Sequence, residues 1–164
     1  FLTLGLTACA SIGFEMPGQP DGPAAAADEA APDLQPDPDL SPDDVVRIQV
    51  EALQNNDAAD TGIEITFRFA SPANKQATGP LFRFAQLVKN PVYSPMLNHK
   101  LAEYGPMQRD GDTATQRVTI VEQDGSATVY LFSLSRQSEP PCLGCWLTDR
   151  VTVVPTRAQD LKGI

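Results

Sequence analysis

The sequence is poor in the residues that bind metals. Its 164 positions include a single histidine, His99, and three cysteines, Cys9, Cys142 and Cys145. A structural zinc site needs four Cys, His or carboxylate ligands, and a closely spaced cysteine pair with one distant histidine leaves that set incomplete. No glycine-rich phosphate loop and no internal repeat is visible either. We therefore expect no metal and no cofactor.

Basic residues are absent from the first 40 positions, which hold seven acids and no Lys or Arg. These acids account for most of the net charge of −9, because residues 41–164 hold 14 acids and 12 bases. That near-neutral part has no basic stripe, which argues against nucleic acid as a partner. Residues 15–40 are rich in Pro, Ala and Asp and bury too little apolar surface to fold. We interpret them as a disordered acidic tether, with an acidic docking arm as the alternative.

Long hydrophobic runs are also missing. The uncharged stretch at residues 1–14 is shorter than the roughly 20 apolar residues that span a bilayer. It contains Leu6-Thr7-Ala8-Cys9, which resembles a lipobox, the signal that directs cleavage before a cysteine and attachment of lipid to its thiol. Cys9 is thus the predicted lipidation site, and two or more acyl chains such as palmitate give stable anchoring. No Met or basic segment precedes Phe1, so we expect a truncated signal peptide.

The lipobox predicts a lipoprotein of the bacterial cell envelope, held on the periplasmic side of a membrane. The alternatives are an ordinary secretory signal or targeting to a plastid or thylakoid lumen.

If Cys9 carries lipid, Cys142 and Cys145 are the two remaining cysteines, spaced C-x-x-C. In an oxidising compartment they can close a small disulfide or stay as inert thiols. A thioredoxin-like pair needs its first cysteine at a helix N-terminus, whereas Pro140-Pro141 precede this one. We expect a structural role.

Residues 41–155 are predicted to form one α+β domain, followed by a tail at residues 156–164. Ser41-Pro42-Asp43-Asp44 is typical of a helix start, with a capping serine, a proline at the first helical position and acids in the first turn. Apolar residues then recur at helical spacing to about residue 55. Residues 62–70 alternate, which indicates a strand, although their position before Ser71-Pro72 also permits a buried helix. Residues 82–89 predict a further helix.

Strand-like runs dominate the second half of the domain. A hairpin turn is predicted at residues 123–126, between two of them. Helices followed by consecutive strands joined by hairpins predict an α+β domain, with a curved four-stranded antiparallel sheet packed on two or three helices. The four predicted strands are residues 100–107, 114–122, 127–135 and 145–154.

Three segments make the chain resemble a known family: Phe67-Arg68-Phe69-Ala70-Ser71-Pro72, Val92-Tyr93, and Gly144-Cys145-Trp146-Leu147-Thr148. They resemble the family called domain of unknown function 4864, over about residues 41–155. The resemblance implies a cone-shaped α+β fold similar to nuclear-transport-factor-2-like and cystatin-like proteins. It also implies that residues 62–70 are helical. It supplies no catalytic residues.

Folds of this cone type enclose a pocket that unrelated functions use, so the fold alone does not decide the function. We expect a membrane-tethered, non-catalytic module that binds a small ligand or a partner protein. The aromatic side chains are candidates for lining a pocket, with packing in the core as the alternative. They are Phe67, Phe69, Tyr93 and Trp146, together with Phe82, Phe84, Tyr104 and Phe132.

Two other functions stay open. An isomerase, cyclase or dehydratase would need an acid–base residue in an apolar cavity, and His99, Asp149 and Tyr104 are the weak candidates, with Tyr93 beside them. His99 lies in a polar stretch and is expected at the surface or as a capping residue, while Asp149 is expected to be solvated or paired with Arg150. The third function is a structural protein that forms a homodimer through an exposed sheet face.

Overall fold

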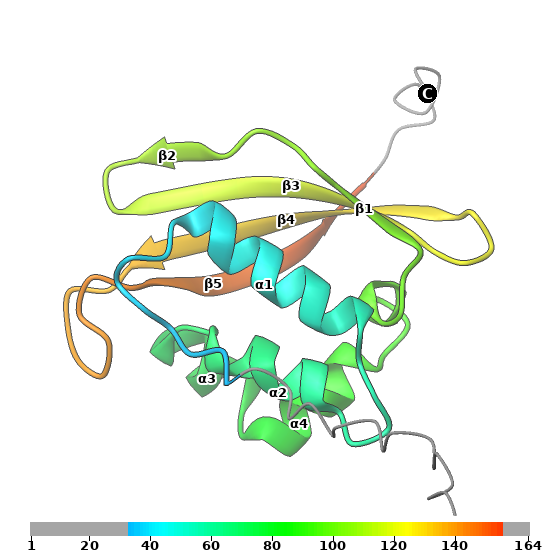
Figure 1. Cartoon of the computed structure of the whole chain (residues 1–164), viewed down its shortest axis with the longest axis horizontal. Helices are drawn as coiled ribbons and strands as arrows, with labels where there is room; N and C mark the ends of the chain where they lie inside the picture. Colours follow the sequence, from blue (N-terminus) through cyan, green and yellow to red (C-terminus); the bar gives the residue numbers. More distant parts are fainter. Residues whose placement is uncertain (1–32, 156–164) are drawn as a thin grey trace, which may run out of the picture. The chain divides into compact units, whose positions relative to one another are not determined.

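The computed structural model describes residues 33–155 (Figure 1). The predicted signal at residues 1–14, with Cys9, lies outside the described residues, as do most of the predicted tether and the tail at residues 156–164. The helical half of the domain comes first. It consists of α1 (Pro42–Gln54), α2 (Thr61–Arg68), α3 (Pro72–Thr78), α4 (Leu81–Val88) and the short 3-10 helix η1 (Ser94–Met96).

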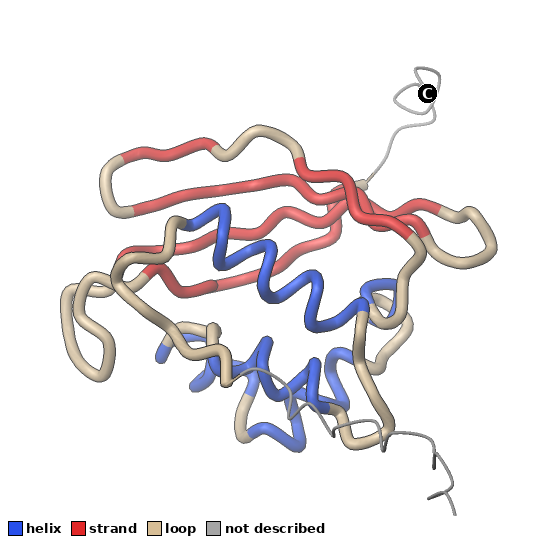
Figure 2. The backbone as a smooth tube through the Cα atoms, viewed as in Figure 1, coloured by secondary structure: helices blue, strands red, loops and turns tan. Residues whose placement is uncertain are grey.

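A single antiparallel sheet follows, with the strand order β1-β3-β4-β5 and with β2 also paired to β3 (Figure 2). The predicted α+β class, helices packed on an antiparallel sheet, is confirmed. The five strands are β1 (Leu101–Tyr104), β2 (Gln108–Asp110), β3 (Thr113–Val121), β4 (Ala127–Arg136) and β5 (Trp146–Val154).

The sheet has one strand more than predicted because the predicted run at residues 100–107 ends as a strand at Tyr104, and a separate strand, β2, follows at residues 108–110. The backbone N–H of Gly105 still donates to the carbonyl of Arg117 at 2.8 Å. The register then shifts by one residue, since Tyr104 pairs with Val118 and Gln108 with Thr115. The chain resumes as β2 along the same edge of β3.

Helix α1 begins as the sequence predicts. The hydroxyl of Ser41 accepts from the backbone N–H of Asp44, and the carboxylate of Asp44 accepts from the backbone N–H of Ser41, which forms a capping box. The same chemistry begins α3, where Ser71 accepts from the backbone N–H of Asn74 and Pro72 occupies the first turn. No helix was predicted to begin at Ser71-Pro72. Four helices therefore replace the predicted two or three.

Residues 62–70 form helix α2 and its C-terminal cap, as the family resemblance implied, so the strand indicated by alternation is wrong. Helix α2 packs against both α1 and α4. A helix covered on two sides buries apolar residues around more of its circumference, so residues two positions apart can both be buried. Ile63 and Ile65, two positions apart, are both buried for this reason.

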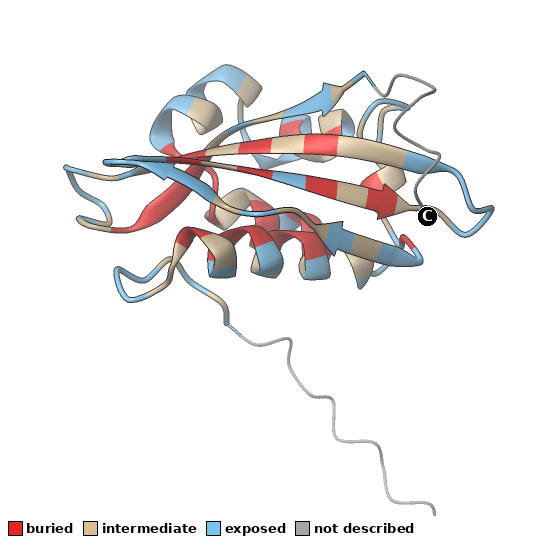
Figure 3. Cartoon of the chain, turned by 90° about the horizontal axis from the view of Figure 1, so that it is seen from above, coloured by how far each residue is buried: buried red, intermediate tan, exposed pale blue. Residues whose placement is uncertain are grey.

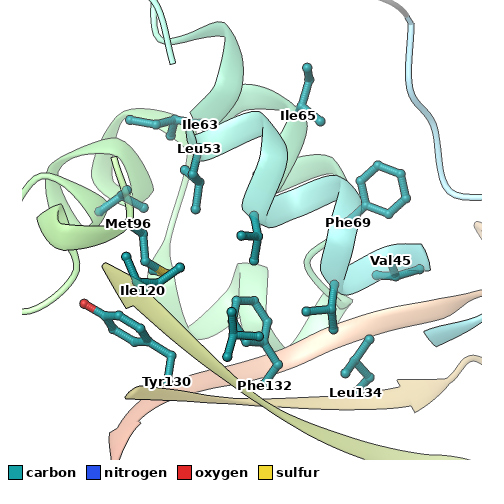
Figure 4. Packing of buried hydrophobic residues seen from close by; sticks show 14 of the residues in the cluster. Val45, Leu53, Ile63, Ile65, Phe69, Met96, Ile120, Tyr130, Phe132 and Leu134 are labelled. Atoms are coloured by element: carbon teal, nitrogen blue, oxygen red, sulfur yellow. The ribbon is translucent and has the colours of Figure 1, made fainter. Parts of the chain in front are cut away.

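The hydrophobic core lies between the helices and the concave face of the sheet, and the buried residues of α1 lie on the side of that helix that faces the strands (Figure 3). Alternate residues of β4 point into it, since successive side chains of a strand face opposite sides. Figure 4 shows Tyr130, Phe132 and Leu134 of β4 reaching toward Val45 and Leu53 of α1.

The loop between β4 and β5 is closed by a disulfide between Cys142 and Cys145, which is the first of the two alternatives that the sequence left open. Backbone bonds extend the hairpin into this loop, from the N–H of Gln137 to the carbonyl of Cys145 and from the N–H of Gly144 to the carbonyl of Gln137.

Residues 33–40, the end of the predicted tether, lie against the domain. Leu34 packs on its core.

Candidate functional site

A pocket of about 330 Å³ lies between the edge strand β5 and helices α3 and α4. Its floor is made by buried side chains of the core, including Leu53, Met96 and Phe132. Its walls come from α4, and exposed residues of α3 and β5 surround the mouth. The wall residues are Phe84, Leu87 and Val88, and those at the mouth are Ala77, Arg150 and Thr152.

The pocket forms because the outer edge of β5 is covered at only two points. At the first, the N–H of Thr148 donates to the carbonyl of Phe69 and the N–H of Ser71 donates to the carbonyl of Thr148, both at 2.9 Å. This short parallel bridge attaches the α2–α3 link to β5. At the second, the hydroxyl of Tyr93 donates to the carbonyl of Val151 at 3.1 Å. The space between these attachments stays open.

A buried polar network joins the floor of the pocket to three elements. The hydroxyl of Thr148 on β5 donates to the side-chain carbonyl of Gln49 on α1 at 2.6 Å. The amide of Gln49 donates to the backbone carbonyl of Thr66 on α2 at 3.1 Å. Buried polar groups are costly unless they are paired, so this network sets the relative position of α1, α2 and β5.

We expect the Gln49–Thr148 bond to couple in a double-mutant cycle. Gln49→Leu or Thr148→Val alone leaves the other side chain buried without its partner and lowers the free energy of unfolding by about 1–3 kcal/mol. The double variant loses less than the sum of the two because neither polar partner remains. Urea denaturation followed by circular dichroism measures all four proteins. Simple additivity of the two losses would contradict the expectation.

His99 is buried, with 3% of its surface exposed, which differs from the expected surface position. Its Nδ1 lies 2.8 Å from the carbonyl of Met96, and its own carbonyl accepts from the amide of Gln54. The backbone N–H of Asn98 also donates to the carbonyl of Leu53. These bonds hold the loop against the end of α1 and turn the imidazole inward, but His99 does not line the pocket.

Asp149 belongs to the pocket lining, yet its carboxylate accepts from the hydroxyl of Ser135 at 3.0 Å. Ser135 follows the core residue Leu134 in β4, so its side chain lies on the face of the sheet away from the helices. Asp149 is the extra residue of a β-bulge, since Thr148 lies opposite Leu134 and Arg150 opposite Ser133. The bulge directs the carboxylate out of the pocket, and no ion pair with Arg150 forms among the described residues.

Tyr104 lies on β1, outside the pocket lining. The guanidinium of Arg47 lies over its ring, 5.4 Å from the centroid. Burial raises the pKa of Tyr104, and the nearby carboxylate of Glu51 raises it further. The phenol therefore stays neutral at physiological pH and is a poor proton acceptor.

Of the four aromatic residues proposed first for a pocket, only Tyr93 lines it. Phe69 and Trp146 pack in the core, and the ring of Phe67 lies 5.1 Å from that of Phe84. Phe84 and Phe132, from the wider aromatic set, do line the pocket. Sequence reasoning missed the polar lining residues, and it missed those on α3 because that helix was not predicted.

Among residues 33–155, no three His, Cys, Asp or Glu side chains come close enough together to hold a metal ion. Within the same range, no helix is long and apolar enough to cross a membrane. The polar groups that line the pocket belong to neutral side chains and to the backbone, and Asp149 and Arg150 of β5 are the charged residues of the lining.

Comparison with known proteins gives one match. No curated protein and no solved structure matches the chain significantly. The model of a family described as Domain of unknown function (DUF4864) matches residues 37–161. This match includes every helix and strand of the domain and covers well over half of the chain. The chain therefore belongs to the DUF4864 family.

Proposed function

We propose that the domain is a non-catalytic binding module that takes up a small ligand in the pocket between β5 and helices α3 and α4. The observation that carries the proposal is a pocket of about 330 Å³ with a buried, mainly apolar floor and an exposed mouth. Ligand sites are typically preformed concave pockets of about 300–1,000 Å³ with apolar walls and a few polar groups. This pocket has that size and that character.

The placement of the acid–base candidates supports binding over catalysis. A general acid or base must lie within hydrogen-bond reach of the reacting atom. The carboxylate of Asp149 is directed to the outer face of the sheet, while His99 and Tyr104 are absent from the lining. Tyr93 does line the pocket, but its hydroxyl already donates a hydrogen bond to the carbonyl of Val151.

The proposal includes a location for the module. Lipid on Cys9 anchors the protein to a membrane of the bacterial cell envelope, on the periplasmic side, and residues before the domain act as its tether. The lipobox-like residues and the acidic, Pro- and Ala-rich segment support this part. The disulfide between Cys142 and Cys145 suits the oxidising conditions outside the cytoplasm. The resemblance to nuclear-transport-factor-2-like folds, whose curved sheet and helices enclose a pocket, supports the ligand site.

The proposal predicts that Ala77→Trp abolishes ligand retention. Ala77 is exposed on α3 at the mouth of the pocket, so an indole there blocks entry without altering the core. Ala73→Trp is the matched control, because Ala73 is exposed on the same helix and does not line the pocket. The full chain and both variants are incubated with a cell extract and examined by native mass spectrometry.

We expect a discrete non-protein mass on the unaltered chain and on Ala73→Trp, and the bare protein mass for Ala77→Trp. Bare masses for all three proteins would contradict the proposed function. The same added mass on all three would also contradict it, because the ligand would then bind elsewhere.

A further inference from the structure

We propose that the ligand of this pocket is an uncharged and largely apolar molecule. The inference rests on the proposed function and adds the chemical class of the ligand. It comes from two properties of the lining residues, namely how their hydrogen-bonding groups are used and where their charges point.

Most hydroxyl and amide groups of the lining are already bonded to the protein. Thr148 donates to Gln49, Gln49 to the carbonyl of Thr66, and Tyr93 to the carbonyl of Val151. Three further donors follow the same pattern: Thr66 to the carbonyl of Gly62, Thr78 to that of Asn74, and Asn74 to that of Thr148. The remaining hydroxyl, that of Thr152, belongs to an exposed residue at the mouth, where water can reach it. Among the described residues, the buried side-chain atoms without a partner belong to His99 and Gln116, which do not line the pocket.

The two charged residues of the lining do not offer their charges to the interior. Asp149 is bonded to Ser135 on the outer face of the sheet. Arg150 lies opposite Ser133, which alternates between the core residues Phe132 and Leu134, so its side chain lies on the same outer face. The lining therefore includes backbone of both residues, while their charged groups remain with the solvent.

A charged ligand would lose its hydration on entry and find no opposite side-chain charge directed into the pocket among the lining residues in return. Burial of an uncompensated charge is among the most costly events in a protein interior. An apolar ligand loses little, since the side chains it would contact belong to Leu53, Phe84, Leu87, Val88, Met96 and Phe132. The pocket thus selects for neutral, hydrophobic molecules.

A matched pair of fluorescent probes tests this selection. N-phenyl-1-naphthylamine is neutral, and 8-anilino-1-naphthalenesulfonate has the same phenylnaphthylamine skeleton with an added sulfonate. Fluorescence titration of the full chain is expected to show saturable binding of the neutral probe, with the sulfonate binding about tenfold or more weakly. Ala77→Trp is expected to abolish binding of the neutral probe, and Ala73→Trp to leave it unchanged.

A second experiment introduces a charge into the wall of the pocket. Leu87 is half-buried in the lining, and Leu87→Arg gives the pocket a cation whose long side chain can still reach water. We expect the ratio of the two affinities to shift toward the sulfonate by about tenfold or more. Gln86→Arg adds the same charge at an exposed neighbouring position outside the lining and is expected to leave the ratio unchanged.

The outcomes separate the two proposals. Equal affinities for both probes, lost together in Ala77→Trp, would overturn the inference and leave the binding function standing. Binding of neither probe, or binding that Ala77→Trp leaves intact, would count against the pocket itself. A sulfonate preference in the unaltered chain would also overturn the inference.

Discussion

Gly62→Ala is expected to lower the free energy of unfolding by about 3 kcal/mol or more. Gly62 lies in α2 where this helix crosses α1, and a Cβ there would lie 2.0 Å from the carbonyl oxygen of Ala52 and 2.8 Å from its carbonyl carbon. Both are backbone atoms of α1, so no side-chain rotation relieves the clash. The helix-propensity gain of about 1 kcal/mol for alanine over glycine is smaller than this cost.

Urea denaturation of the full chain, followed by far-ultraviolet circular dichroism, measures the loss. Gly125→Ala is the control: nothing lies within 4 Å of its added Cβ, but its φ of +87° strains an L-residue. That strain alone costs about 1 kcal/mol. A loss in Gly62→Ala no larger than in Gly125→Ala would show that α1 and α2 are not in contact at this point.

Phe132→Ala is expected to lower the free energy of unfolding by about 3–5 kcal/mol. Phe132 is 1% exposed, lies at the centre of the sheet opposite Gln116 of β3 and Val151 of β5, and forms part of the pocket floor. Its loss removes apolar burial and leaves a cavity between α1 and the sheet, which neighbouring side chains fill only in part.

The matched control applies the same substitution at Phe82, which is 64% exposed at the start of α4. Phe82→Ala is expected to change the free energy of unfolding by about 0.5 kcal/mol or less. Both variants are compared by urea denaturation, with the slope of each transition checked for two-state behaviour. Similar losses at the two positions would contradict the described burial of Phe132.

Much of the secondary structure can be predicted from short segments of the sequence. The capping box of Ser41 needs only residues up to Asp44, and the hairpin after β3 needs only its turn. The alternation of β3 and β4 reflects one buried face, which is why both strands follow the predicted pattern. The close spacing of Cys142 and Cys145 made a disulfide possible, but it did not distinguish that bond from two free thiols.

Helix α2 and the inward position of His99 depended on what packs around them. The apolar alternation of α2 suggested a strand, and its contacts with α1 and α4 explain why residues two positions apart are buried in a helix. His99 stands between polar neighbours in the sequence. Its loop is held inward by the carbonyl of Met96 nearby and by Gln54 of α1, 45 positions earlier. In both cases contacts with other elements of the fold override the local preference.

The α+β class, the capped start of α1 and the alternation of β3 and β4 could be predicted from the sequence, because each depends on interactions between near neighbours. The pocket could not be predicted in this way, because it exists only in the folded domain. The hydrogen bond in its floor joins Gln49 to Thr148 across 99 positions, and its two ends are defined by the contacts of β5 with Phe69 and with Tyr93. Such a site arises where separate elements meet, and its residues share no local pattern along the chain.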